Sequence, residues 1–298
     1  MSKIKNFEEF LKEEVFVRPN EPVQQAQPVQ DQALQPQPAQ PVQPQMAQST
    51  QPMDFSKANK KLDFIYLDKD ANIEKVKEIC ESIKLPENEK YIYGIVVRPE
   101  FISETKKYLE DGGDFKIIAA VSYPTGDDKN SEKMKQLQKS ISDGADEINV
   151  VMDYNKLIGI MSVTEEDKKE DKLKDIQTDI RSLVEYCKER SKIIKIVIEM
   201  EALGDETKIS KAVEICKEAN VDFITTSTGM FNQNTKYSFE TKMKDVTDIV
   251  IPLIQGMDDI NINVSGGVNS KDRLLSCLKD SKIQRISTTM SPQNLLKK

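Results

Sequence analysis

The segments KIIKIVIE (192–199) and VDFITTS (221–227), with the amphipathic stretch 205–219 between them, decide the fold class. Both short segments are rich in β-branched residues, which favours strands, whereas the stretch between them has helical periodicity. Two strands that are joined through a helix pair in parallel, through a right-handed crossover. This unit therefore predicts an α/β protein.

The same alternation continues outward from about residue 56 to the end of the chain. The predicted strands are 62–67, 91–97, 115–122, 146–152, 192–199, 221–227, 262–265 and 283–288. The predicted helices are 72–84, 100–110, 129–142, 165–190, 205–219, 236–255 and 270–279, with a short final helix after Pro292. Eight such units in about 240 residues indicate a (β/α)8 TIM barrel.

An open, doubly wound sheet is the alternative architecture. It is disfavoured because no GxGxxG or GxxxxGK[ST] motif follows an early strand. The longest connection between predicted strands, 153–192, is expected to hold one long polar helix.

The first 55 residues have a different composition. Residues 19–52 carry 8 of the 13 prolines and 12 glutamines, and their only charges are Glu21 and Asp31. Such a segment buries too little apolar area to offset the entropy of ordering it. We expect a disordered, polyproline-like linker over 15–55 and the barrel over 56–298. A proline-rich ligand for a partner domain is the alternative interpretation of this linker.

Residues 1–14, MSKIKNFEEFLKEE, form a separate peptide in this prediction. Ile4, Phe7, Phe10 and Leu11 lie on one helical stripe, and most other positions are charged. A helix this short is unstable alone in water, so it is expected to form when it docks on a protein partner.

The amino-acid composition excludes several kinds of active site, metal site and partner. The 298 residues include no histidine, which excludes His-ligated zinc sites, Ser-His-Asp triads and Cys-His dyads. The net charge is −7 and no basic stripe is present, so no nucleic-acid partner is expected. No apolar run reaches the roughly 18 residues of a membrane span, and the N-terminus lacks the apolar segment of a secretory signal. We expect a cytoplasmic protein with no membrane partner.

The four cysteines stand at 80, 187, 216 and 277, with no CxxC pair, each in a helix-like stretch. This pattern predicts buried, reduced thiols, which fits a reducing compartment.

The candidate nucleophile is Lys195, because active sites of TIM barrels lie at the C-terminal ends of the strands. In 193–199, one face carries Ile194, Ile196 and Ile198, and the other carries Lys195, Val197 and Glu199. Helices cover the outside of a barrel, so Lys195 is expected to point inward. A buried lysine is unfavourable unless it is paired or functional. It either pairs with Glu199 or forms a Schiff base with a carbonyl substrate.

Three successive strand ends carry hydroxyls and glycines suited to an anion. The runs are 225–229 (TTSTG), 265–267 (SGG) and 287–289 (STT). Loops after strands seven and eight are the usual phosphate seat of this fold, and glycines let backbone N–H groups approach an anion. The candidate phosphate-binding residues are Thr226, Ser227, Gly229, Gly266, Gly267, Asn269, Ser287 and Thr288.

With these motifs the chain resembles the deoxyribose-phosphate aldolase family over nearly all of 62–290. The matching blocks are LDFIYLDKDANIEKVKEIC (62–80), Pro124-Thr125-Gly126, GADEINVV (144–151), KIVIEMEAL (195–203), DFITTSTG (222–229) and VSGGV (264–268). The resemblance implies a class I aldolase, a lyase that cleaves 2-deoxyribose 5-phosphate through a lysine Schiff base without metal or other cofactor. The implied ligand is a sugar phosphate or an aldehyde, and a homodimer is left open.

Carried over residue by residue, the resemblance places the Schiff-base lysine on Lys195 and finds other functional positions replaced. The second active-site lysine falls on Thr225, the proton-relay aspartate on Asn149, the lysine before Gly-Gly on Asn263, the arginine after it on Asn269, and the glycine of the last phosphate loop on Ser287. Without the second ammonium, nothing lowers the nucleophile's pKa by like-charge repulsion. Loss of the relay removes about 10²–10⁴-fold in rate. Glu147, Glu199 and Asp222 remain candidates to replace it.

We therefore favour an aldolase-like barrel with degraded catalysis, a pseudoenzyme that acts as a binding or structural protein. An active class I aldolase is the alternative. The NFEEFLKEE helix and its linker resemble the capsid-targeting peptide of internal head proteins in T-even-type tailed phages, and Leu11-Lys12-Glu13-Glu14 resembles the cleavage site there. This resemblance implies a capsid or scaffold partner for residues 1–14 and adds the virion as an alternative location.

Overall fold

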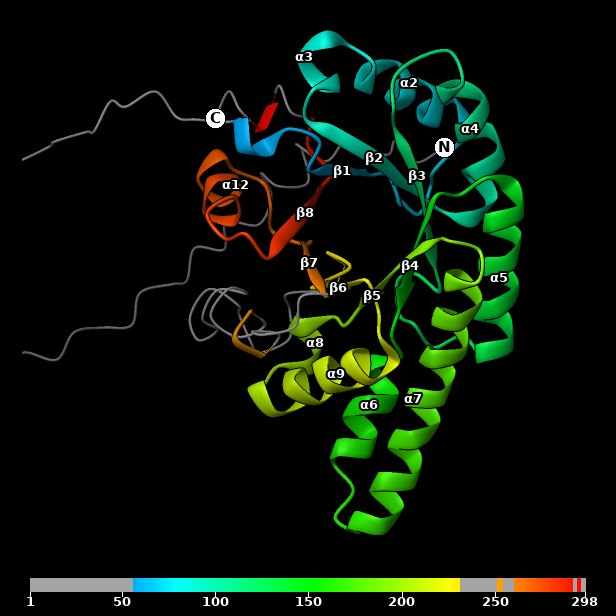
Figure 1. Ribbon diagram of the computed structural model, residues 1–298, viewed down its shortest axis with the longest axis vertical. Coiled ribbons are helices and arrows are strands. Elements are labelled where there is room, and N and C mark those ends of the chain that lie inside the picture. Colours follow the sequence, from blue (N-terminus) through cyan, green and yellow to red (C-terminus); the bar gives the residue numbers. More distant parts are fainter. Residues whose placement is uncertain (1–55, 231–250, 254–259, 292–293, 296–298) are drawn as a thin grey trace, which may run out of the picture. The chain divides into compact units, whose positions relative to one another are not determined.

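The computed structural model describes residues 56–230, 251–253, 260–291 and 294–295, and these contain a closed barrel of eight parallel strands (Figure 1). The strands are β1 (Leu62–Ile65), β2 (Ile92–Val97), β3 (Lys116–Val121), β4 (Glu147–Val151), β5 (Ile193–Val197), β6 (Phe223–Thr225), β7 (Asn261–Val264) and β8 (Ile283–Thr288). Each pairs with the next along the chain, and β8 closes the ring on β1 with Leu62 opposite Ile286. The predicted TIM barrel is confirmed, and the open sheet is excluded.

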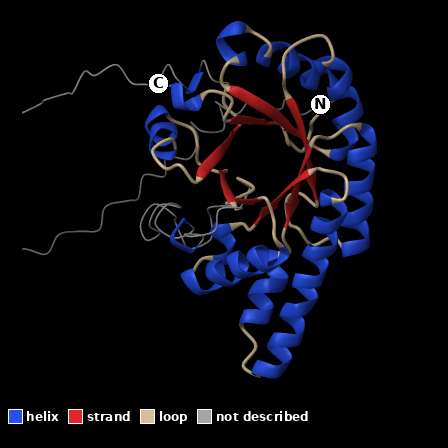
Figure 2. Cartoon of the chain, in the orientation of Figure 1, coloured by secondary structure: helices blue, strands red, loops and turns tan. Residues whose placement is uncertain are grey.

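Helices surround the strands on the outside (Figure 2). The longer ones are α2 (Ile73–Ile83), α4 (Ile102–Leu109), α5 (Asn130–Asp143), α6 (Tyr154–Met161), α7 (Glu166–Lys188), α9 (Glu206–Ala219) and α12 (Lys271–Cys277). Short turns of helix lie at η1 (Ser56–Ala58), α3 (Pro86–Glu89), η2 (Pro99–Phe101) and α8 (Met200–Leu203). Among the described residues, no helix is both long and apolar enough to cross a membrane.

Two predicted regions lie largely outside the described residues. The first is the N-terminal region, which comprises the predicted peptide 1–14 and the predicted linker 15–55. The second is most of the helix predicted over 236–255.

The connection between β4 and β5 differs from the prediction of one long helix, because it holds both α6 and α7. The Asp153 carboxylate caps α6 by accepting a hydrogen bond from the Lys156 N–H at 2.8 Å. Leu157 and Ile160 bury their side chains in the core. A capping aspartate followed by apolar residues at this spacing is a helix signal, which the prediction missed.

The strands alternate as predicted between the helix-facing core and the barrel interior. Ile194, Ile196 and Ile198 are fully buried in the main core. A smaller apolar cluster fills part of the interior, formed by Leu67, Val96, Ile118 and Ala120, with Ile65 and Tyr123 beside it. Other parts of the interior hold buried polar and charged side chains, and these contain the candidate site.

The four cysteines are buried and form no disulfide, as predicted. Burial raises the pKa of Cys80 and of Cys187 to about 12. Thiols in this state are inert at neutral pH, so the structure gives them a packing role.

Candidate active site

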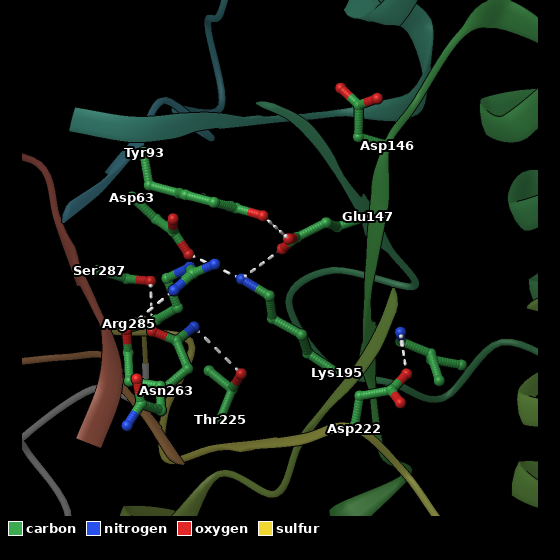
Figure 3. A network of polar contacts seen from close by, with 12 residues as sticks. Asp63, Tyr93, Asp146, Glu147, Lys195, Asp222, Thr225, Asn263, Arg285 and Ser287 are labelled. Carbon is green, nitrogen blue, oxygen red and sulfur yellow. Dashed lines mark hydrogen bonds and ion pairs between the residues drawn. The ribbon is translucent and has the colours of Figure 1, made fainter. Parts of the chain in front are cut away.

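Lys195 extends from β5 into the barrel interior and has no exposed surface. Its Nζ lies 2.8 Å from Oδ2 of Asp63 on β1 and 2.8 Å from Oε2 of Glu147 on β4 (Figure 3). The contact with Asp63 is also a hydrogen bond, whereas the contact with Glu147 is an ion pair without hydrogen-bond alignment. The amine is thus held between two carboxylates in a part of the interior with no exposed surface.

Further charged and aromatic groups complete this buried network. The Tyr93 hydroxyl on β2 donates to Oε1 of Glu147 at 2.5 Å. The guanidinium of Arg285 on β8 lies 3.4 Å from the centre of the Tyr93 ring. The ring of Phe223 on β6 lies 5.2 Å from the Lys195 amine. Six strands thus contribute residues to the network of the two carboxylates and the amine.

The pKa values of the two carboxyls, Asp63 and Glu147, are shifted in opposite directions. Burial raises the pKa of Asp63, and the nearby Lys195 only partly opposes this. Burial also acts upward on Glu147, but Lys195, Tyr93 and Arg285 outweigh it and hold the pKa of Glu147 below its ordinary value. Glu147 is therefore the ionised partner of Lys195. Asp63 is less well satisfied, because its Oδ1 is buried and accepts no hydrogen bond from the described residues.

Three of the replaced positions bond to one another at the C-terminal end of the barrel. The Asn263 amide on β7 donates to the Thr225 hydroxyl on β6 at 3.2 Å. Its oxygen accepts from the Ser287 hydroxyl on β8 at 3.0 Å (Figure 3). All three side chains are buried. A neutral hydrogen-bonded chain therefore occupies the positions where the family resemblance implies two lysines and a glycine.

Asn149 lies on β4 with its Cα opposite that of Lys195. Its amide oxygen is buried and accepts no hydrogen bond from the described residues. An amide cannot accept a proton at neutral pH, so this side chain can orient a ligand but cannot relay protons. Asn149 also lines a small cavity at the barrel mouth, described below.

Glu199 does not pair with Lys195, which corrects one of the two sequence interpretations. Its carboxylate accepts hydrogen bonds from the Ser227 hydroxyl at 2.7 Å, from the Thr228 N–H at 2.9 Å and from the Thr228 hydroxyl. It is fully buried and has a left-handed backbone, with φ of 51°. The alternative of a lysine–carboxylate pair holds in the structure, but the partners are Glu147 and Asp63. Chain direction turns at Glu199, so strand alternation no longer predicts its neighbours.

The other predicted phosphate-binding hydroxyls are also engaged within the protein. The Thr226 hydroxyl donates to the Ser265 carbonyl and accepts from its N–H, and the Thr288 hydroxyl donates to the Val268 carbonyl. The Asn269 N–H donates to the Gly267 carbonyl at 3.0 Å. These bonds close the three loops against one another and leave fewer donors for an anion.

The Gly-Gly turn carries a carboxylate beside it. Gly266 has φ of 85°, and a Cβ there would lie 3.0 Å from the Ser227 Cβ, so glycine is required. The same position lies 3.8 Å from Oε1 of Glu201. Burial and the neighbouring Glu199 raise the pKa of Glu201 to about 6. At neutral pH the Glu201 carboxylate therefore places a negative charge next to the predicted phosphate loop. Gly229 and Gly267 also have positive φ, 75° and 68°.

The barrel mouth has little free volume. Its cavity measures about 20 Å³, which is room for about one water molecule. The described residues that line it are Ile65, Leu67, Val96, Ala120, Tyr123, Asn149, Val151, Val197, Thr225, Ser227, Thr228, Ser265 and Ser287. None of these is a lysine or arginine, and the described part of the chain holds no cluster of three or more carboxylate or cysteine ligands for a metal ion.

The remaining acidic candidates have structural partners. Asp222 accepts a hydrogen bond from the Ile194 N–H at 2.9 Å and lies apart from Lys195 (Figure 3). The sequence prediction missed Asp63, Tyr93 and Arg285. Asp63 had a signal, because it interrupts the apolar strand LDFI at the inward-facing register. Tyr93 and Arg285 gave no comparable signal.

A closed parallel barrel with an inward lysine on β5 and hydroxyl- and glycine-rich loops after β6 to β8 defines an aldolase-like TIM-barrel protein. The sequence model of the DeoC/LacD family aldolases matches residues 48–289, and the chain belongs to this family.

Individual relatives agree with this assignment. A deoxyribose-phosphate aldolase of Mycoplasmoides gallisepticum is 30% identical over 241 residues, 80% of this chain and 94% of that protein. One of Lactiplantibacillus plantarum is 27% identical over 235 residues, 79% and 97% of the two chains. The tetrameric deoxyribose phosphate aldolase of Aeropyrum pernix superimposes with a TM-score of 0.60 at 20% identity, covering 81% of this chain and 90% of that one, which shows a shared fold.

Proposed function

We propose that this chain is a deoxyribose-phosphate aldolase-like barrel with degraded catalysis that acts as a binding or structural protein. The observation that carries the proposal is the state of the Lys195 amine. It is fully buried and contacts two carboxylates, Asp63 and Glu147, at 2.8 Å each.

The magnitude of this constraint is large on the scale of catalysis. To attack a carbonyl, the amine must lose a proton and leave both carboxylates. Separating one partner from a buried ion pair costs about 3–5 kcal/mol, which is about 10²–10⁴-fold in rate. The missing proton relay at Asn149 removes a further factor of about 10²–10⁴. Together these losses reduce a typical aldolase rate to a negligible one.

The barrel mouth supports the same proposal. Thr225, Asn263 and Ser287 bond to one another in place of the two lysines and the glycine that the resemblance implies. Glu201 places a carboxylate beside Gly266, where a phosphate would need positive charge or free N–H groups. The cavity of about 20 Å³ is far too small for a sugar phosphate. A ligand of this mouth would be small and uncharged.

The protein partner is proposed for residues 1–14, on the sequence alone. The amphipathic NFEEFLKEE peptide and the linker suit a domain that is carried to an assembly, with a phage capsid or scaffold as the candidate partner. The barrel would then be packaged cargo or a structural component, and its oligomeric state is proposed to be a homodimer.

The alternative is a working class I aldolase that cleaves 2-deoxyribose 5-phosphate or a related sugar phosphate. Lys195 favours it, because this residue stands at the Schiff-base position of the family and points into the barrel. The names of the relatives agree with this activity. Under this alternative, substrate binding would have to move the amine away from Asp63 and Glu147.

A coupled turnover assay with 2-deoxyribose 5-phosphate at pH 7 separates the two functions. The Lactiplantibacillus plantarum relative serves as the active control, and Lys195→Arg keeps the buried charge but cannot form the Schiff base. We expect the wild type and Lys195→Arg to be equally inactive. Wild-type turnover within about tenfold of the ~10 s⁻¹ median for enzymes, lost in Lys195→Arg, would establish the lyase instead.

A further inference from the structure

A second cavity, of about 200 Å³, lies outside the barrel, between the wall formed by β4 and β5 and the helices α5 and α7. We call it the lateral cavity. Its apolar lining is Val150, Val151, Met152, Ile176, Ile180, Leu183 and Ile196, and its polar lining is Asp127, Asp128, Lys129, Asn130, Lys133, Asp153, Lys156 and Asp179. It is about ten times larger than the cavity at the barrel mouth. A cavity of about 150 Å³ already accommodates benzene, so a small organic molecule fits here.

The lateral cavity contains a buried amine with little coordination. Lys133 on α5 is only 8% exposed, and its Nζ donates one hydrogen bond, to the Val151 carbonyl at 3.1 Å. Within the described residues, no carboxylate lies within ion-pair distance of this Nζ, in contrast to Lys195 with its two partners. A neutral amine can keep the bond to Val151 and still offer its lone pair to the cavity.

The surroundings of Lys133 favour its neutral amine form more than an exposed site would. Burial lowers the pKa of Lys133, and the more distant carboxylates only partly oppose this. The charged groups that line the cavity around the amine are Asp127, Asp128 and Lys129 before α5, Asp153 and Lys156 at α6, and Asp179 on α7. Desolvation of this kind is one of the ways in which lysines become nucleophilic.

We propose that Lys133 is the aldehyde-reactive amine of this protein and that the lateral cavity takes a small, uncharged aliphatic aldehyde. The apolar lining from α7 and β4 accommodates the alkyl chain. Four aspartates against three lysines around the cavity disfavour a phosphorylated aldehyde.

The reaction is a reversible condensation. The lone pair of Nζ attacks the carbonyl carbon, and the oxygen takes up the proton that nitrogen loses, which gives a carbinolamine. The C–O bond then breaks as the hydroxyl leaves with a second proton from nitrogen. The products are the imine and one molecule of water, so no oxidant or reductant is needed. This inference is separate from the proposed function, because its nucleophile, Lys133, lies outside the barrel and it uses none of the polar residues inside the barrel.

The test is reductive trapping on the full chain. The protein is incubated at pH 7 with a limiting amount of butanal and sodium cyanoborohydride, and the butylated lysines are mapped by peptide mass spectrometry. Lys129 lines the same cavity but is exposed, so it is the matched internal control. We expect labelling of Lys133 clearly above that of Lys129, since the buried amine lies in the cavity and its lowered pKa raises the fraction that is neutral. Equal labelling of the two, or labelling mainly at Lys195, would overturn the proposal.

Two further measurements separate the cavity from general lysine reactivity. Lys133→Arg keeps a cation on α5 but cannot form the imine, and it is expected to lose the fast fraction of the label while the exposed lysines are unchanged. Glyceraldehyde 3-phosphate in place of butanal is expected to leave Lys133 at the level of Lys129. Preferential labelling of Lys133 by the phosphorylated aldehyde would show that the cavity does not select uncharged molecules.

Discussion

Replacing Lys195 by Met tests directly whether the two carboxylates hold the amine. The variant removes a side chain with no exposed surface and leaves Asp63 and Glu147 in the interior without their common partner. Breaking a buried ion pair by removing one partner costs about 3–5 kcal/mol. A domain has about 5–15 kcal/mol of stability, so the variant is expected to fold with a strongly reduced free energy of unfolding at pH 7.

The pH dependence of this loss has a definite sign. Without Lys195, the largest opposing influence on Asp63 is lost, so burial and the neighbouring Glu147 raise the pKa of Asp63 further above that of the unfolded chain, whereas Tyr93 and Arg285 still oppose burial at Glu147. A carboxyl with a raised pKa binds more protons in the folded state, so the variant gains stability as pH falls. The difference between wild type and variant is therefore expected to shrink from pH 7 to pH 5.

Urea unfolding followed by circular dichroism measures both effects. Lys116→Met is the matched control, because Lys116 pairs with the exposed Asp114 at 2.7 Å and its loss should cost at most about 1 kcal/mol. Adding Asp63→Asn and Glu147→Gln to Lys195→Met should recover much of the stability, since no buried carboxylate is then left without its lysine. A loss for Lys195→Met as small as that for Lys116→Met would refute the reasoning and free the amine for catalysis.

Three further predictions address the mouth and the N-terminus. The double variant Thr225→Lys with Asn149→Asp is expected to raise 2-deoxyribose 5-phosphate cleavage by about 10²-fold in the coupled assay. The reason is that a second ammonium and a base return to the site. If the double variant shows no gain over either single variant, the defect lies at Lys195. Glu201→Gln should add about 1 kcal/mol to the free energy of unfolding at pH 7 but nothing at pH 4.5, because a raised pKa destabilises only above the unfolded value. Urea titrations check this, with exposed Glu185→Gln as the control, and a pH-independent effect would contradict it. Deleting residues 1–14 should leave the melting temperature of the barrel unchanged in calorimetry, and a large decrease would show that the peptide packs on the barrel.

Much of the fold was predictable because it depends on local periodicity. Short β-branched runs and amphipathic helices repeat along the chain, and parallel strands joined by right-handed crossovers leave few topologies. The inward direction of Lys195 followed from strand alternation with its isoleucine neighbours, which have to face the helices. The helix α6 was missed because the whole connection between β4 and β5 was predicted to hold a single long helix. The capping residue Asp153 nevertheless marks the start of a separate helix.

The contacts of Lys195 were decided only by the tertiary structure. Glu199 is four residues away and on the same predicted face, yet the chain turns there, and its carboxylate binds Ser227 and Thr228. Asp63 is 132 residues away along the chain and supplies a partner. Closing the ring brings β1 and β4 to the same level of the interior as β5, and desolvation there requires every charge to find an opposite one. Sequence alone thus determined which face each strand residue occupies, whereas closure of the barrel determined which charges meet, because pairing depends on distance across the ring and not along the chain.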